Sequence, residues 1–254
     1  MPAQVLGLPL VWLTFACIIF AAQALARTLK KKHNPELVHN ALSLMGSLYI
    51  FTTALILSYY VNQVNQLVAA TTNEIIAINH LNVTLSALPK EQRIEGRRLL
   101  FDYVQAVAKD ESQTSIERQR SEKAETAVKA FQHFAGTNGI ATKSQESQSP
   151  AITEYNKNIN QFTHDLIQQR ERRISLSRHF RPKGLWLAIA AMFFTLCTCA
   201  FLIQSSGQAQ WILMALLAAG PPVPSLLLYI YSHPLAFGLV DIADMFNAFL
   251  QFSR

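Results

Sequence analysis

The chain has 254 residues, of which 50% are hydrophobic and only 15% are charged, and its formal net charge is +6. Soluble domains have roughly 25% charged residues, so this composition disfavours an ordinary soluble protein. Asp, Glu, Lys and Arg are all missing from residues 1–26, 37–73 and 184–240. Since ~20 apolar residues per helix cross a bilayer core ~30 Å thick, we predict an all-α, polytopic membrane protein with four transmembrane helices. Its excess basic residues then flank these helices, and no nucleic-acid partner is expected.

The first two predicted spans cover residues 5–26 and 41–61. The first ends in Ala24-Leu25-Ala26, similar to a signal-peptide cleavage site, but no basic side chain precedes it. Signal peptides begin with positive charge, so we expect an uncleaved helix. After the second span, apolar residues continue at spacings of three and four from Val64 to Leu88. This helical stripe, close to a heptad pattern, predicts one continuous helix reaching about Ala87.

A long helical domain is expected between the second and third spans. Pro89 marks a break, and an amphipathic helix is predicted over residues 90–110. Residues 111–134 are more highly charged and are also expected to be helical, whereas Gly, Ser, Thr and Gln in residues 136–149 predict a loop. A further helix is predicted over residues 151–178, with Arg170 continuing its apolar face.

The third and fourth spans are predicted at residues 185–204 and 211–231, joined by an uncharged turn at 205–208. The sequence Gly220-Pro221-Pro222-Val223-Pro224 predicts a kink or break in the fourth span. Residues 235–252 have the pattern of an amphipathic helix lying at the membrane surface or against the bundle. The predicted organisation is a transmembrane hairpin at 1–62, a soluble helical domain at 63–183, a second transmembrane hairpin at 184–233 and an amphipathic C-terminal segment at 234–254.

The second span is the best candidate for lining a pore. One stripe of this predicted helix combines small, apolar and hydroxyl side chains: Gly46, Ile50, Thr53, Leu57 and Tyr60. In a ring of such helices, apolar side chains gate by dewetting and hydroxyls line wetter levels. Helix packing within a non-conducting bundle explains the same pattern. No charged residue lies inside any span, which argues against a proton-coupled pump or transporter.

Charged residues beside the spans suggest two further sites. Glu74 is the one charged residue between Leu37 and Pro89, and it is a candidate for pairing with Arg170 or Arg173 or for a charged ring at a pore mouth. An ordinary solvated or paired carboxylate is the simpler interpretation. The basic run before the third span also contains candidates for binding anionic lipid headgroups: Arg172, Arg178, Arg181 and Lys183. Topological flanking of the span explains this run equally well.

Enzymatic and metal chemistry find no support in the sequence. It contains no Gly-rich phosphate loop, no HExxH motif and no nucleophile elbow. The seven histidines are scattered, and Cys197 and Cys199 point to different faces of a helix, so no metal site is expected. We predict that the protein is not an enzyme and has no cofactor.

Several segments resemble the bacterial family of bestrophin-like domain proteins, a family without an assigned function. They are Asn73-Glu74, Leu88 to Arg93, Leu99 to Val104, Arg170 to Ile174, and Pro182 with Leu185-Trp186. A further element, Pro234 to Gly238, departs from the family pattern, because Leu235 replaces the usual Phe and the Gly comes one residue late. The resemblance runs from the second span to the C-terminus, some four-fifths of the chain. It implies a distant likeness to bestrophins, which are homopentameric anion channels with cytosolic helical domains.

These observations leave two functions open. The first is a homo-oligomeric channel in the cell (inner) membrane that conducts ions around the second span, with anions as the candidate ions. The second is a non-conducting membrane scaffold or sensor that acts through the central helical domain. The basic residues give conflicting indications of the orientation in the membrane. One group, Arg27 and Lys30–Lys32, follows the first span, and the other precedes the third span. Each group favours the cytoplasm, but the second span places them on opposite sides of the membrane. The resemblance favours a cytoplasmic central domain.

Overall fold

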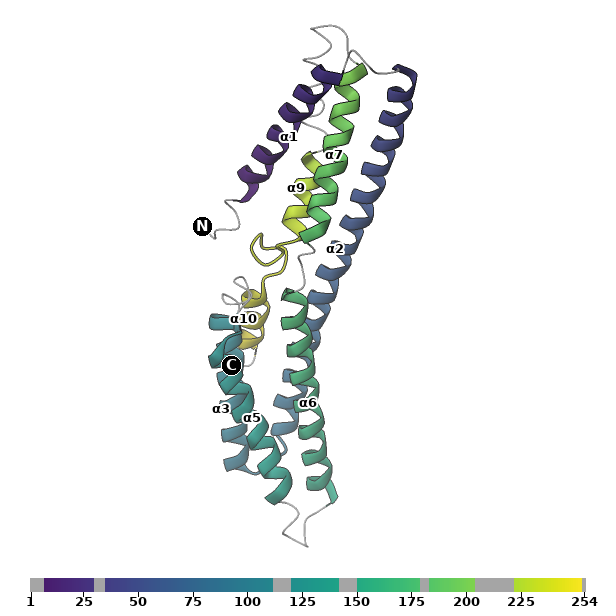
Figure 1. The fold of residues 1–254 in the computed structure, drawn as a ribbon. Helices are drawn as coiled ribbons and strands as arrows, with labels where there is room; N and C mark the ends of the chain where they lie inside the picture. Colours follow the sequence, from purple (N-terminus) through teal and green to yellow (C-terminus); the bar gives the residue numbers. More distant parts are fainter. Residues whose placement is uncertain are drawn as a thin grey trace. The chain divides into compact units, whose positions relative to one another are not determined.

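A computed structural model describes residues 7–29, 35–111, 120–141, 150–178, 183–203 and 222–252. Within these ranges the chain is helical, with turns and no strand. Figure 1 shows the elements in chain order: α1 (Gly7–Leu29), α2 (Pro35–Leu85), α3 (Lys90–Ala106), the π-helical turn η1 (Val107–Glu111), α5 (Glu122–Ala141), α6 (Pro150–Arg178), α7 (Lys183–Ile203), α9 (Pro222–Tyr231) and α10 (Ile242–Phe252). The expected all-α class is therefore confirmed.

The chain divides into two compact units. Unit 1 comprises Met1–Gln63 and Phe180–Phe237, and unit 2 comprises Val64–His179 and Gly238–Arg254. The chain thus passes between the units at three places: within α2, between α6 and α7, and between α9 and α10. The C-terminal helix α10 belongs to unit 2 and packs against η1 and α3, which is the second of the two positions expected for it.

Helix α2 is a single helix of 51 residues, about 76 Å long at 1.5 Å per residue. It ends at Leu85, two residues before the predicted end, and Pro89 precedes α3 as expected. It is the one helix among the described residues that is long and apolar enough to cross a membrane, and only 17% of its most apolar stretch is buried within the chain. Residues 13–29 and 187–203 form shorter apolar helices.

Unit 1 is held together by apolar and hydroxyl contacts. Helices α1 and α7 lie side by side (Figure 1), and the rings of Phe15 and Phe193 meet edge to face with centroids 4.8 Å apart. Tyr49 of α2 lies near Phe193, and its hydroxyl is 3.0 Å from the hydroxyl of Ser225 on α9. The described part of the predicted fourth span begins at Pro222, the first turn of a helix, where proline is favoured. The predicted turn at 205–208 lies outside the described residues.

Unit 2 packs α3, α5 and α6 with the C-terminal part of α2 and with α10. The buried stripe of α2 contains Leu67, Ile78, Leu81 and Leu85, whereas Val68, which belongs to the predicted stripe from Val64 to Leu88, is 37% exposed. Helices approach closely at Gly96, where an added Cβ would lie 2.6 Å from Leu85 and 2.9 Å from Phe134. A side chain at position 96 therefore has no room without a shift of these neighbours.

Two predicted boundaries in unit 2 are wrong. Within the helix expected over residues 111–134, residues 120 and 121 are not helical and α5 begins at Glu122, because the Ser121 hydroxyl accepts a hydrogen bond from the amide of Ala124 and caps the helix there. Residues 112–119 lie outside the described ranges. The loop expected from residue 136 is helical as far as Ala141. A glycine in a helix costs only about 1 kcal/mol, so a helix anchored by packing continues through Gly136. Residues 142–149 lie outside the described ranges.

Candidate functional site

The most unusual feature of unit 2 is a set of four charged side chains with almost no exposure to solvent. Glu74 and Arg173 are 0% exposed, Glu111 is 0% exposed and Arg170 is 2% exposed. We call these four residues the buried charge cluster. A buried charge is expensive unless it is paired and hydrogen-bonded, so the geometry of each pair is informative.

Glu74 and Arg173 form a two-point ion pair. The Arg173 Nε donates to Glu74 Oε2 at 2.7 Å, and its Nη2 donates to Glu74 Oε1 at 3.1 Å. The Tyr103 hydroxyl of α3 also donates to Glu74 Oε1. The two parallel hydrogen bonds from the planar guanidinium fix the orientation of the Glu74 carboxylate relative to α6. The Tyr103 phenol links the same carboxylate to α3.

Glu111 bridges the two arginines. Arg170 Nη2 donates to Glu111 Oε1 at 2.7 Å, and Arg173 Nη2 donates to Glu111 Oε2 at 2.7 Å. Arg170 and Arg173 are three residues apart on α6, so both side chains leave the same face of the helix. One carboxylate therefore meets both guanidiniums, and the cluster contains two negative and two positive charges.

The position of Glu111 depends on the π-helical turn η1. Helix α3 ends at Ala106, and η1 follows from Val107 to Glu111 with Glu111 as its last residue. π-turns are rare and occur often at functional sites. A π-turn contains one more residue than an α-turn, so it changes the direction in which the next side chain points.

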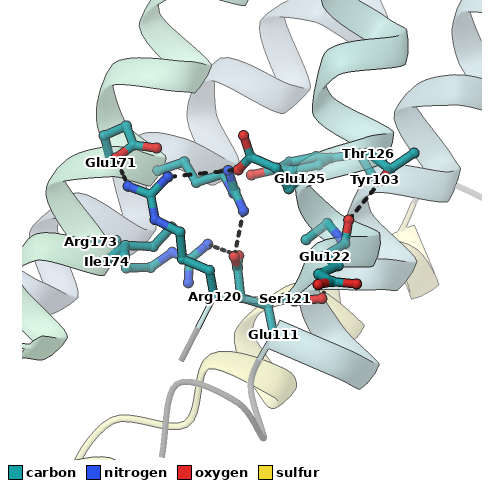
Figure 2. Close-up of polar contacts among 12 residues, drawn as sticks. Tyr103, Glu111, Arg120, Ser121, Glu122, Glu125, Thr126, Glu171, Arg173 and Ile174 are labelled. Atoms are coloured by element: carbon teal, nitrogen blue, oxygen red, sulfur yellow. Dashed lines mark hydrogen bonds and ion pairs between the residues drawn. The ribbon is translucent and has the colours of Figure 1, made fainter. Parts of the chain in front are cut away.

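A second layer of charges surrounds the cluster (Figure 2). Arg170 Nη1 donates to Glu125 Oε2 at 2.8 Å, and the Glu125 side chain is 29% exposed. Glu125 also lies 3.3 Å from Lys129 Nζ, and Arg120 is paired with Glu171. The charges thus become progressively more exposed from Arg173 outward.

The electrostatic balance of the cluster favours the ionised forms of Glu111 and Arg173. Burial by itself raises the pKa of Glu111, but the guanidiniums of Arg173 and Arg170 outweigh burial and hold that pKa below its ordinary value. Burial also opposes the charged form of Arg173, yet Glu74 and Glu111 raise its pKa well above the ordinary value. The pKa of Tyr103 is raised well above 10, first by burial and then by Glu74, so Tyr103 stays a hydrogen-bond donor.

Two N–H groups in the cluster have no hydrogen-bond partner among the described residues. They are Nη1 of Arg173 and Nε of Arg170, and both atoms are buried. The plane of the Arg173 guanidinium also lies near the Phe246 ring of α10, with Cζ 5.8 Å from the ring centroid. Arg173 therefore contacts α2 and η1 through ion pairs and α10 through a cation–π contact.

The sequence singled out three members of this site and missed two partners. Glu74, Arg170 and Arg173 were candidates, and the structure places Glu74 with Arg173 but pairs Arg170 with Glu111 and Glu125. Of the simpler interpretation of Glu74, a solvated or paired carboxylate, the solvated form is wrong, because the side chain is fully buried, whereas the pairing is present. A charged ring at a pore mouth stays a prediction. Tyr103 and Glu111 were not proposed. Glu111 continues the apolar face formed by Leu100, Val104 and Val107 at helical spacing, and this signal could have identified it.

The five pore candidates do not share one free surface of the chain. Thr53 and Tyr60 are buried, with 3% and 0% exposure, and the Thr53 hydroxyl donates to the carbonyl of Tyr49. Gly46 and Leu57 are half-buried, and Ile50 is 70% exposed. Lining of a pore by this stripe stays a prediction, and Ile50 is the member that another chain or lipid can reach most easily.

The predicted headgroup ligands are described in part. Arg172 is exposed on α6, on a different face from its buried neighbour Arg173. The side chains of Arg178 and Lys183 and the whole of Arg181 lie outside the described residues. Lipid binding by this run stays a prediction.

A shallow groove of about 720 Å³ lies between the α3–η1 segment and α5. Its lining includes the small side chains of Ala106 and Ala127 and the charged side chains of Arg98, Asp102 and Lys123. All three of these charges are paired, since Arg98 lies 3.0 Å from Asp102, and Lys123 lies 2.8 Å from Asp110. The groove therefore combines small side chains with paired charges.

Comparison with known families identifies the class of protein. The model of the bestrophin-like domain family matches residues 8–236, and the chain belongs to this family. The match begins earlier than the motifs recognised in the sequence, since it includes α1, and it ends before α10. No curated protein and no solved structure shows significant similarity to the chain.

Proposed function

We propose that the protein is a multi-pass integral membrane protein of the bestrophin-like family that forms a homo-oligomeric ion channel, for anions, around α2. Its partners are the lipid bilayer, further copies of itself and the conducted ion, and it requires no cofactor or nucleic acid and catalyses no reaction. The family supports this proposal through its likeness to bestrophins, which conduct anions.

The observation that carries the proposal is the character of α2. A core helix of a soluble protein is mostly buried by its own chain, but only 17% of the most apolar stretch of α2 is buried. Large apolar side chains such as Leu44, Ile50 and Phe51 are 63–70% exposed. Exposed apolar surface of this extent calls for lipid or another subunit, and a ring of α2 helices uses both.

The proposed topology has four spans and a cytoplasmic unit 2. Described helices α1, α2, α7 and α9 lie largely within the three uncharged stretches, with α7 and α9 both in the third. Reporter fusions at Thr142 and after Arg254 test this arrangement. Cytoplasmic fluorescence at both sites is expected, and phosphatase activity at either site would contradict the topology.

Conduction is tested with purified protein in planar bilayers. We expect single-channel currents from the wild-type protein. Exchanging Ile50 for Thr should change the conductance or ion selectivity, because a hydroxyl alters the wetting of an apolar constriction. Leu48→Thr is the matched control, since Leu48 is also exposed but lies on a different face of α2. Silent bilayers with well-folded oligomers would contradict the channel.

A scaffold or sensor without conduction is the second candidate, and the groove between α3 and α5 favours it. Ala127→Trp would fill part of this groove. If a partner binds there, the variant should lose a cross-link that a photoreactive group at Thr126 makes in native membranes, while membrane insertion stays normal. A cross-link product identical in both proteins, or consisting of the chain alone, would contradict this function.

A further inference from the structure

We propose that the buried charge cluster is a latch that holds together the three segments through which unit 2 continues into unit 1, and that η1 is its movable part. The inference goes beyond the proposed channel, because it concerns how a change in unit 2 reaches those segments. It applies equally to a conducting protein and to a sensor.

The position of Arg173 in the chain is the first argument. Three segments leave unit 2, namely α2, the end of α6 and the start of the C-terminal segment. Arg173 itself lies on α6, it is ion-paired with Glu74 of α2, and it lies against Phe246 of α10. One side chain therefore contacts both other connecting segments within unit 2.

The choice of charged residues is the second argument. Buried ion pairs often contribute no more stability than well-packed apolar residues of similar size, and their better-attested role is to specify one arrangement or a switch. Apolar side chains are buried elsewhere in unit 2, among them Leu67 and Leu100, so this unit can form a centre without charges. Four charges at the meeting point of the connecting segments are therefore explained by a requirement for one defined arrangement.

The π-turn provides the second arrangement that a latch needs. If η1 took up α-helical hydrogen bonding, one residue would leave the turn, and Glu111 would rotate by about 100° around the helix axis. The carboxylate would then leave both arginines, while Glu74 would still neutralise Arg173. The backbone stays hydrogen-bonded in both registers, so the two states differ mainly by the Glu111 contacts. Elements that can pack in two discrete arrangements convert small local shifts into larger conformational changes.

Amide hydrogen exchange of the full-length protein in nanodiscs tests the latch. In Glu111→Gln we expect exchange to rise about tenfold, the factor that corresponds to a lost charge-assisted hydrogen bond, in α10 and in the unit 2 parts of α2 and α6 together. Glu95→Gln is the matched control, because Glu95 is an exposed carboxylate paired with Arg98, and its exchange pattern should equal that of the wild type. An increase confined to η1 and its neighbouring turn overturns the proposal.

Two further variants keep the test decisive if Glu111→Gln does not fold. Glu111→Asp keeps the charge but shortens the reach, and a smaller increase in the same three segments is expected; no increase outside η1 overturns the latch. Phe246→Ala removes a buried ring of α10 together with its contact to Arg173 and leaves the ion pairs of the cluster in place. Exchange should therefore rise in α10 while α2 and α6 keep the wild-type rate, and an increase in all three segments contradicts the assignment of the α2 and α6 contacts to the ion pairs. None of these measurements requires conduction, so failure of the channel proposal leaves the result interpretable.

Discussion

In unit 1 the buried polar side chains of the described residues are hydroxyls, such as Thr53 and Ser225, and one histidine, whereas unit 2 buries two carboxylates and two guanidiniums. The difference follows the sequence, since the uncharged stretches cover nearly all of the described part of unit 1. A hydroxyl can bond to the carbonyl of its own helix, as Thr53 does with Tyr49. A charged group in hydrocarbon is not satisfied by one backbone carbonyl of its own helix and needs a partner of opposite charge or water.

This contrast indicates that one chain uses two ways to specify helix packing. Unit 1 relies on apolar surfaces and short hydroxyl contacts, which remain satisfied in lipid. Unit 2 has a charged exterior and uses ion pairs in its centre. Mutations that remove one polar contact should therefore have a large effect in unit 2 and a small one in unit 1, and the following experiments test that expectation.

The largest effect is expected from Arg173→Ala. The substitution leaves the buried carboxylate of Glu74 without its arginine, and Glu111 keeps only Arg170. Breaking a buried ion pair in this way costs about 3–5 kcal/mol of unfolding free energy. Thermal unfolding followed by far-ultraviolet circular dichroism should lose the cooperative transition of unit 2. All three tryptophans, at positions 12, 186 and 211, lie in unit 1, so their fluorescence should keep its wild-type transition. Arg98→Ala, which removes exposed pairs with Glu95 and Asp102, should cost much less, because solvent screens surface ion pairs. Equal losses of unfolding free energy in Arg173→Ala and Arg98→Ala would contradict the larger contribution expected of the buried ion pair.

A steric change comes next in size. Gly96→Ala places a Cβ within 2.6 Å of Leu85 and 2.9 Å of Phe134, and such overpacking costs about 1–3 kcal/mol. Gly136→Ala is its control, because this helical glycine has no side-chain neighbour within 4 Å of the new Cβ, and replacing it should stabilise α5 by up to about 1 kcal/mol. Chemical denaturation of both variants gives the comparison, and a stabilising Gly96→Ala would contradict the packing at this point.

Acid should weaken unit 2 before unit 1. The pKa of Glu111 is lower in the folded protein than its ordinary value of about 4.3. Its contribution to stability is therefore complete above that ordinary value and is lost as the pH falls through the lower, folded-state pKa. A series of unfolding curves from pH 6 to pH 2 should show this loss in the wild-type protein. In Glu111→Gln the same part of the pH dependence should be missing, and an unchanged dependence would exclude Glu111 as its source.

The smallest effect is expected in unit 1. Tyr49→Phe removes the hydroxyl contact with Ser225 at 3.0 Å, and interhelical hydrogen bonds of this type in membranes contribute about 0.6 kcal/mol on average. Tyr59→Phe, at a side chain that is 48% exposed, serves as the control and should be neutral. Tryptophan fluorescence during denaturation in detergent measures both variants. A loss as large as that of Arg173→Ala would show that unit 1 depends on polar contacts as strongly as unit 2.

Much of the fold follows from local pattern. The long α2 helix, the break at Pro89 and the helix ending at Arg178 were all predictable, because apolar spacing and proline act over a few residues. The start of α5 at Glu122 was not, since several residues in that charged segment could cap a helix and packing selects Ser121. The exposed Val68 shows the same limit, because a stripe of spacing three and four leaves the exact buried face of α2 undecided.

The sequence by itself determined the helical class and the family, and it singled out the long uncharged segments and the side chains of Glu74, Arg170 and Arg173. It did so because charge depletion and motif order are properties of the linear chain. Only the tertiary structure decided that Glu111 and Tyr103 complete the site, that Arg170 pairs with Glu111 rather than Glu74, and that α10 contributes Phe246. These pairings join residues 29 to 99 positions apart, and the π-turn that directs Glu111 depends on the energy of the whole packed cluster rather than on the five residues of η1.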